Sequence, residues 1–256
     1  MPRPKTINEV LQRLDSIIEE TIRENNYLGI FAYVYRRTTA AIQQAIIEKQ
    51  FEDNERMEHF DVVFANRYID AYECFRLQQP ISRSWRIAFD AKNEQLTSIQ
   101  HLIMGMNAHI SFDLGLAAET IAPKAQIGDL KNDFMKVNDI LQKIINEMQT
   151  RIGKVSWSMF LLDWVGQDSD EKVINFGIVS SRRFAWQFAI GLAGLEGDAK
   201  NALIKNTDRA VAAISYRIKN PITRTLKITL KMISFFEKKN VKDIIKNLSA
   251  GEESYL

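Results

Sequence analysis

The sequence predicts an all-α protein, a single multi-helix bundle-like domain over residues 1–256 with two central apolar helices. Apolar residues recur at spacings of three and four along nearly the whole chain, which is typical of helices that bury one face. Only 11 Gly and 5 Pro occur in 256 residues, and so few helix breakers favour long helices joined by short loops. No repeat and no separating linker is visible, so we expect one domain with a frayed tail at 249–256.

The N-terminal part is predicted to form amphipathic helices. The first spans residues 6–26 and carries one apolar stripe on a charged background. Thr6 and Glu9 have the spacing of a capping box at its start. A second helix is expected at 28–49, and a third at 57–78, ending before a proline.

The remaining helices follow from the same periodicity. They are expected at 82–94, 100–117, 127–153 and 172–196, with two more that end near 218 and begin near 221. Residues 154–171 are less regular, and we expect a short apolar helical turn followed by an acidic loop.

The helix expected at 100–117 is apolar on nearly all sides yet carries His101, Asn107, His109 and Asp113. A helix of this kind is usually buried, and its polar groups then need hydrogen-bond partners. Residues eight apart are separated by about 12 Å along a helix, so His101 and His109 cannot bind one metal ion. We interpret His101 as a tether between helices. His109 and Asp113 are four apart on one face, where they can share a metal or form an imidazole held by its carboxylate.

The helix expected at 57–78 has the same mixed character. Asn66, Asp70 and Glu73 fall on one stripe of it. If it packs against the helix at 100–117, Asp70 could face His109 and Asp113, as in bundle sites that bind a divalent metal or perform acid–base chemistry.

The alternatives for these residues are structural. Asp70 has possible ion-pair partners in Arg67 and Arg182, and the polar residues together can form a closed hydrogen-bond network that sets helix register. The chain has no Glu-x-x-His pair, which disfavours a dinuclear oxygen-activating site. Haem bound by His109 is the least favoured reading.

Several of these segments together resemble a known family. The blocks FDVVFANRYIDAY, SRSWRIAF and GMNAHISFDLGLA are similar to blocks of a bacterial domain-of-unknown-function family numbered 5995. The resemblance covers roughly Ile30 to Asp113 and, more weakly, RRFAW at 182–186. The positions to which it points are Asp61, Asn66, Asp70, Trp85, Arg86, Asn107, His109, Asp113 and Arg182. It implies candidate positions and no activity.

We therefore expect an enzyme that acts on a small, partly apolar molecule in a pocket between the central helices. A hydrolase or lyase type of reaction is favoured over an oxidoreductase. The expected catalytic residues, and the ligands of a single divalent metal if one binds, are His109, Asp113 and Asp70. The residues expected to bind substrate are Asn66, Asn107, Arg182 and Arg86.

Composition narrows the partners and the compartment. A formal net charge of +2 gives no overall signal for binding nucleic acid. The single cysteine excludes an intramolecular disulfide and any cysteine-cluster metal site, which favours the reducing cytoplasm. No secretory signal and no apolar run near the roughly 18 residues of a membrane span are visible.

The C-terminal region supports a different function, that of a non-catalytic helical module. Its cations greatly outnumber its two acids, Glu237 and Asp243. They are Arg217, Lys219, Arg224, Lys227, Lys231, Lys238, Lys239, Lys242 and Lys246. Together with interleaved apolar residues they predict a basic amphipathic helix, which could bind a membrane surface or a protein partner, or simply pack on the core with a solvated face.

Overall fold

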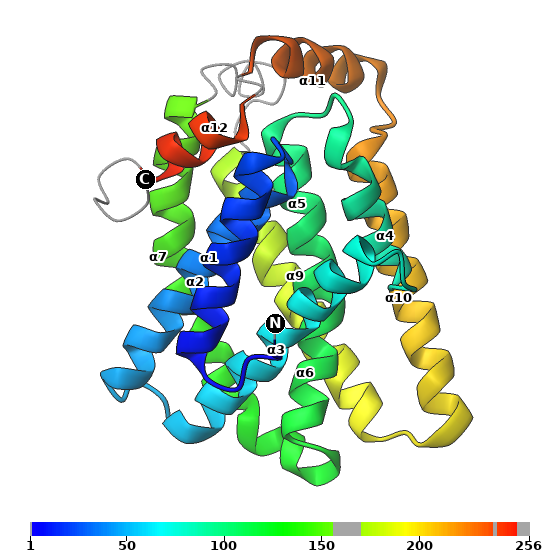
Figure 1. Cartoon of the computed structure of the whole chain (residues 1–256). Coiled ribbons are helices and arrows are strands. Elements are labelled where there is room, and N and C mark those ends of the chain that lie inside the picture. Colours follow the sequence, from blue (N-terminus) through cyan, green and yellow to red (C-terminus); the bar gives the residue numbers. More distant parts are fainter. Residues whose placement is uncertain (1, 156–169, 238–239, 250–256) are drawn as a thin grey trace.

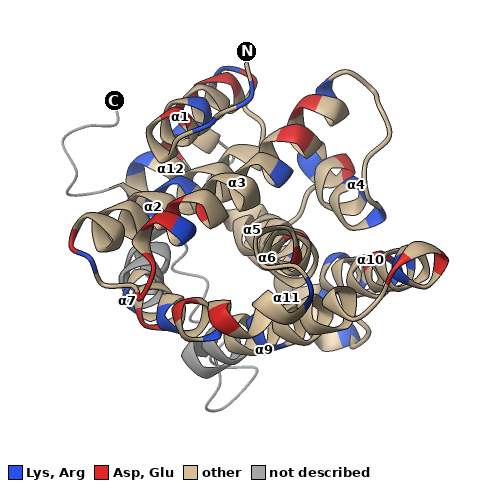
Figure 2. Ribbon diagram, turned by 90° about the horizontal axis from the view of Figure 1, so that it is seen from below, with Lys and Arg blue, Asp and Glu red and all other residues tan. Residues whose placement is uncertain are grey.

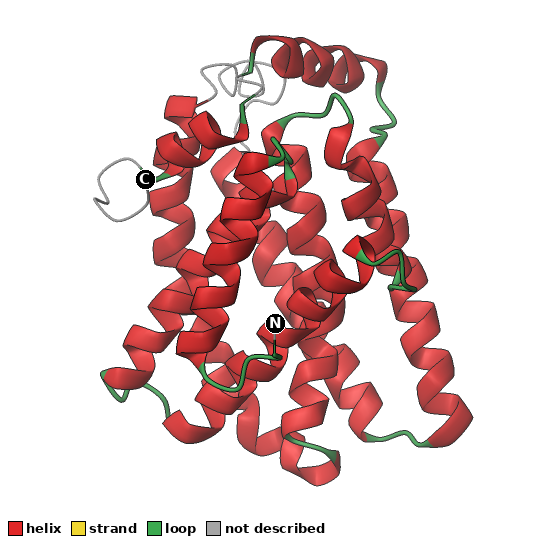
Figure 3. Ribbon diagram, viewed as in Figure 1, coloured by secondary structure: helices red, strands yellow, loops and turns green. Residues whose placement is uncertain are grey.

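The computed structural model describes residues 2–155, 170–237 and 240–249, and this part of the chain contains helices and no strand (Figures 1 and 3). In chain order the α-helices are α1 (Ile7–Arg23), α2 (Leu28–Ile47), α3 (Asn54–Arg76), α4 (Arg83–Asp90), α5 (Ser98–Ala108), α6 (Leu114–Ile121), α7 (Lys131–Val155), α9 (Asp170–Ala193), α10 (Gly197–Lys219), α11 (Arg224–Phe236) and α12 (Val241–Leu248). The predicted all-α class is confirmed, and the helices pack into one domain.

The first helix begins where the sequence predicts. Thr6 is its N-cap, and the Thr6 hydroxyl accepts a hydrogen bond from the Glu9 N–H at 3.2 Å. The Glu9 carboxylate in turn accepts from the Lys5 N–H, so the second half of the capping box is displaced by one residue. The apolar stripe of α1 is buried against α2 and α3, as its periodicity requires.

The segment predicted as one helix at 100–117 differs from expectation in its middle. It begins with a complete capping box, in which Thr97 and Gln100 each bind the other's backbone N–H. Between α5 and α6 lies a π-helical turn, His109–Asp113, which closes with a bond from the Leu114 N–H to the His109 carbonyl. Such turns widen a helix by one residue and occur frequently at functional sites.

The C-terminal part differs from the predicted single helix that begins near 221. It forms α11 and α12, because Glu237 is extended and Asn240 starts a new helix by accepting from the Lys242 N–H. A 3-10 helix, Lys124–Leu130, precedes α7 after Pro123. Most of the loop predicted at 154–171 and nearly all of the tail predicted at 249–256 lie outside the described residues.

Three apolar clusters hold the helices together, and the smallest joins α9 and α10 to the π-helical turn. The largest one packs α1, α2, α3, α4 and α5 with α12, around aromatic side chains that are almost fully buried. These include Tyr33, Tyr68, Tyr72, Trp85 and Phe89. The second cluster joins α6, α7 and α9 to parts of α2 and α3. The candidate site described below lies where residues of the two larger clusters meet.

Viewed from below, α2, α7, α9 and the α5–α6 pair surround the centre of the molecule, and α4 and α10 lie outside that pair (Figure 2). Acidic and basic positions alternate over the helices without a wide region of one sign, consistent with the small net charge. Within the described ranges, no helix has both the length and the apolar content needed to cross a bilayer.

Candidate functional site

A partly enclosed cavity of about 120 Å³ lies between α2, α3, α5, α6, α7 and α9. Most of its lining is apolar, with side chains such as Phe31, Leu102 and Leu141. The polar or ionisable lining residues are Tyr35, Thr38, Asp61, His109 and Arg182. A mainly apolar cavity with a few convergent polar groups is the usual form of a small-molecule site.

His109 enters this cavity from the π-helical turn, and Asp113 at the other end of the same turn holds it. The His109 Nδ1 lies 3.1 Å from Asp113 Oδ2, and the same oxygen accepts a bond from the Trp85 indole N–H at 2.8 Å. Because a carboxylate oxygen only accepts, we assign the imidazole proton to Nδ1. The Nε2 atom then carries the lone pair.

The imidazole is packed among aromatic rings. It stacks on Phe64 at 3.8 Å between ring centroids and meets the edge of Tyr35 at 4.4 Å. The residue is only 2% exposed, and its buried Nε2 has no hydrogen-bond partner among the described residues. Burial lowers the pKa of His109 and outweighs the bond to Asp113, which acts in the opposite direction. The imidazole is therefore neutral at pH 7 and Nε2 can accept a proton.

Asp61 contributes a carboxyl group to the same cavity. It is 8% exposed, and its Oδ2 atom has no hydrogen-bond partner in the described part of the chain. Burial raises the pKa of Asp61 to about 7. The family resemblance points to Asp61. The periodicity of the helix does not select it, because Asp61 lies off the stripe that carries Asp70. The signal in the sequence is an acid within an apolar stripe, since Met57, Phe64 and Tyr68 follow the same face of α3.

Arg182 reaches the cavity from α9, and of the four residues predicted to bind substrate it alone lines the cavity. It is 5% exposed, and it donates to the Asn138 side-chain oxygen and the Phe134 carbonyl. The guanidinium lies over the Phe134 ring at 4.4 Å. Burial lowers the pKa of Arg182 to about 9. No carboxylate of the described residues forms an ion pair with it, so the predicted pairing with Asp70 does not occur.

The structure corrects the predicted set of His109, Asp113 and Asp70. Asp70 is half-exposed and forms an ion pair with Arg3 at 2.9 Å. It lines a separate, more open pocket of about 420 Å³, to which Asp113 and Arg67 also contribute and His109 does not. The predicted three-ligand metal site is not formed, and no other group of three His, Cys, Asp or Glu in the described ranges has suitable geometry.

The other predicted residues lie outside this cavity and make contacts within the protein. Asn66 donates to the Pro4 carbonyl at 2.9 Å, which fastens the N-terminal segment to α3. Asn107 donates to the Val211 carbonyl and the Ser215 hydroxyl on α10, both at 2.9 Å. Arg86 lies on the surface of α4 with its guanidinium over an aromatic ring. His101 stacks on an aromatic ring of the core at 4.7 Å, which makes it a packing residue.

Comparison with known proteins adds the family and no activity. The family model described as "Family of unknown function (DUF5995)" matches residues 7–221. The matched region includes all residues that line the cavity. No curated protein and no solved structure matches the chain.

Proposed function

This chain belongs to the DUF5995 family, and we propose that it is an enzyme that binds a small, mainly apolar molecule in the partly enclosed cavity and uses His109 as a general base. Asp113 orients the imidazole and stabilises the imidazolium that forms. The hydrolase or lyase type of reaction remains the proposal, because both depend on moving a proton at the reacting group. The site needs no metal for this role.

One observation carries the proposal: Nε2 of His109 is buried against an apolar cavity and has no partner in the described part of the chain, while Nδ1 is held by Asp113. An unsatisfied buried polar atom costs about 1–3 kcal/mol, so a native structure rarely keeps one without a role. A ligand proton donor would satisfy it. The carboxylate–imidazole arrangement is the one that orients catalytic bases in other enzymes, where it fixes the tautomer.

The partial enclosure strengthens this chemistry. Apolar walls limit the water that reaches the imidazole, so a bound ligand competes with little solvent for Nε2. When Nε2 takes a proton, the positive charge forms beside the Asp113 carboxylate in a medium of low dielectric constant, where the attraction is strong. A positioned base of this kind accelerates proton transfer by about 10²- to 10⁴-fold.

The experiment compares the wild-type protein with His109→Gln on two probes. Hydrolysis of ethyl butyrate, a six-carbon ester, followed by the release of acid, reports on activation of water, and exchange of the α-hydrogens of 2-hexanone in deuterated water, followed by NMR, reports on direct proton abstraction. We expect the substitution to lower kcat on the active probe by about 10²- to 10⁴-fold. Unfolding in urea verifies that the variant is folded.

The matched control is His101→Gln, which changes a second buried histidine that lies outside the cavity. It should leave kcat within a factor of two or so, because His101 does not face the ligand. Equal rates for the wild-type protein and His109→Gln, or no turnover of either probe by the wild-type protein, would contradict the proposal.

The exposed face of α11 favours a second function, contact with an anionic membrane surface. Ile228, Met232 and Phe235 form one row on this helix and are 53%, 49% and 72% exposed. Lys227 and Lys231 are exposed beside them. In Figure 1, α11 lies across the top of the molecule, at its periphery. The cytoplasmic leaflet carries negative charge, and a cytoplasmic location is part of this proposal.

Flotation with vesicles tests this second function. We expect the protein to float with vesicles of phosphatidylserine and phosphatidylcholine and to remain below with phosphatidylcholine alone. The double variant Ile228→Glu/Met232→Glu should lose the binding. Ile214→Glu is the control, because this residue of α10 is similarly exposed at 50%. Binding that is absent in the wild-type protein, or unchanged in the double variant, would refute the contact.

A further inference from the structure

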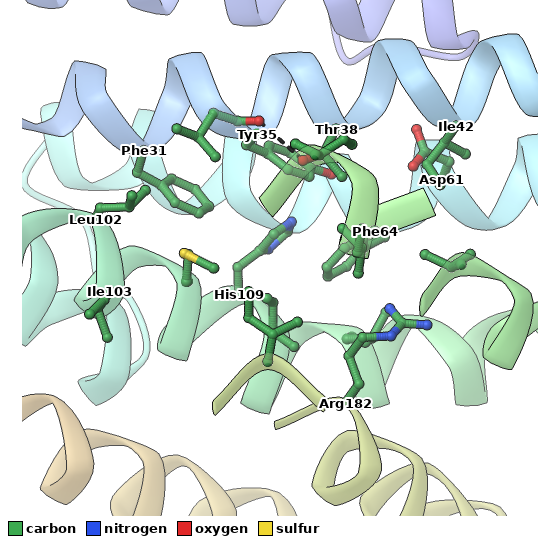
Figure 4. Close-up of a pocket in the computed structure, with 18 of the residues that line it drawn as sticks. Phe31, Tyr35, Thr38, Ile42, Asp61, Phe64, Leu102, Ile103, His109 and Arg182 are labelled. Carbon is green, nitrogen blue, oxygen red and sulfur yellow. Dashed lines mark hydrogen bonds between the residues drawn. The ribbon is translucent and has the colours of Figure 1, made fainter. Parts of the chain in front are cut away.

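The two ends of the cavity differ in chemistry. Figure 4 shows Asp61 and Arg182 toward one end and Leu102 and Ile103 toward the other, with His109 between them. We propose that the ligand of this cavity is a short apolar carboxylate, bound with its carboxylate at the end lined by Asp61 and Arg182 and its hydrocarbon part toward Leu102 and Ile103. This inference rests on the proposed function and names its class of substrate.

Charge balance supports an anion. Arg182 is a buried cation, and it forms no ion pair with the described residues. Burying an unpaired charge is costly, so a partner of opposite sign stabilises it strongly. Asp61 does not fill that role, since no ion pair joins the two side chains. One negative charge on the ligand would neutralise this end of the cavity.

Hydrogen-bonding capacity supports the same conclusion. A guanidinium has five N–H donors, and the bonds of Arg182 to Asn138 and Phe134 occupy two of them. The remaining donors match the two oxygens of a carboxylate, which accepts from arginine in a bidentate manner. Asp61 in its protonated form adds an O–H donor, and its Oδ2 has no partner in the described ranges. A neutral hydrocarbon would leave these groups unsatisfied.

The size of the cavity limits the hydrocarbon part. Its volume of about 120 Å³ compares with cavities near 150 Å³ that bind benzene. The walls beyond Arg182 and Asp61 are apolar side chains of α2 and α5, including Val34 and Met106. These walls offer no partner for a second charged group. The cavity therefore fits an acid of about six carbons, and not one with charges at both ends.

Isothermal titration calorimetry with three six-carbon probes tests the proposal. The probes are hexanoate, 1-hexanol and hexylamine, measured at pH 6, where Asp61 is mainly protonated. We expect hexanoate to bind at least about tenfold more tightly than hexanol, and hexylamine to bind most weakly. Arg182→Gln should lower hexanoate affinity by about 10- to 100-fold and leave hexanol affinity nearly unchanged. Arg183→Gln is the matched control, because this neighbouring arginine is exposed.

A second variant keeps the test decisive if Arg182→Gln does not fold. Asp61 ionises as the pH rises through about 7, and its negative charge then repels a bound carboxylate. Among the described residues, the titratable groups that share its cavity are Tyr35 on α2, His109 on the π-helical turn and Arg182 on α9, and the described lining residues of α7 are apolar. Hexanoate affinity should therefore fall by about tenfold between pH 6 and pH 8 in the wild-type protein. In Asp61→Asn it should stay nearly constant.

The outcomes separate this inference from the proposed function. If hexanoate and hexanol bind equally at both pH values, the ligand is not an anion, and the assignment of the carboxylate end is overturned while the cavity remains a binding site. If none of the three probes binds, the inference and the proposed binding pocket both fail. Tight, Arg182-dependent binding of hexanoate with no effect of His109→Gln on turnover would support the ligand class and overturn the general base.

Discussion

Replacing Gly105 by alanine should destabilise the protein, although alanine is the better helix former. Gly105 lies on α5, one turn before His109. In the structure, a Cβ atom at this position would lie 2.7, 2.8 and 3.0 Å from three atoms of the Phe31 side chain. Cβ atoms in proteins essentially never lie within 3.0 Å of a non-bonded heavy atom, so the Phe31 side chain must move.

Phe31 has little freedom to move. Its ring is 5.0 Å from the Tyr68 ring and 5.7 Å from both Tyr35 and Trp85, measured between centroids. Forcing extra atoms into a packed core costs about 1–3 kcal/mol. The gain from replacing a helical glycine is about 0.5–1 kcal/mol. Taken from the middle of both ranges, the net loss for Gly105→Ala is about 1 kcal/mol, which lowers Tm by roughly 2–4 °C for a chain of this size.

Urea unfolding followed by circular dichroism measures the change. The control is Gly177→Ala in α9, because a Cβ atom there meets no heavy atom of the described residues within 4 Å. That substitution should raise the free energy of unfolding by about 0.5–1 kcal/mol. The same substitution is therefore expected to lower the free energy of unfolding at Gly105 and to raise it at Gly177. A Gly105→Ala protein as stable as the wild type would show that the packing around Phe31 yields easily, and the reasoning would be refuted.

Three further substitutions test the packing of polar groups. Burial lowers the pKa of His101 to about 4, whereas the pKa of a histidine in the unfolded chain is about 6.5. The unfolded state therefore binds more protons below pH 6.5. As a result, the free energy of unfolding falls by roughly 2 kcal/mol between pH 7 and pH 5. His101→Phe should flatten that slope in urea titrations, and an unchanged slope would contradict the assignment. Asp133 is 1% exposed and accepts from two backbone N–H groups and Arg56, so Asp133→Asn should cost about 2 kcal/mol, and a loss below 0.5 kcal/mol or so would contradict this. Thr97→Ala removes the N-cap of α5 and should cost about 1 kcal/mol in the same assay, whereas no loss would show that the cap is dispensable.

Local patterns in the sequence predict the helices well, because helix formation and burial depend on residues within a few turns. The start of α1 at its Thr6 cap illustrates this. The π-helical turn is different: its residues satisfy the α-helical period equally well, and only the surrounding packing selects the wider turn. The break between α11 and α12 likewise occurs in a stretch without glycine or proline.

The candidate site shows the same division between local and distant contacts. The pairing of His109 with Asp113 follows from a spacing of four along one helix, and the structure has it. The contact expected between Asp70 and His109 needs knowledge of how α3 is rotated against its neighbours, which periodicity does not provide. Asp70 instead forms an ion pair with Arg3 of the N-terminal segment. Asp61 and Arg182 are 121 positions apart in the chain, and only the fold places both at one cavity.

The π-helical turn also changes which side of its helix each later residue faces. Before the turn, Leu102 and Met106 line the cavity, and in a regular α-helix position 113 would lie on the same side as Leu102, because eleven residues are close to three turns of about 3.6 residues. The extra residue advances the helix by one position, so Leu114 takes that place and Asp113 faces the open pocket on the other side. Removing one of the residues between His109 and Asp113 would restore the ordinary period with Leu114 still at the cavity, but it would shorten the spacing of His109 and Asp113 from four residues to three and so disturb their contact. The length of this segment therefore matters as much as its composition, and a change of one residue in length would be more damaging than most substitutions within it.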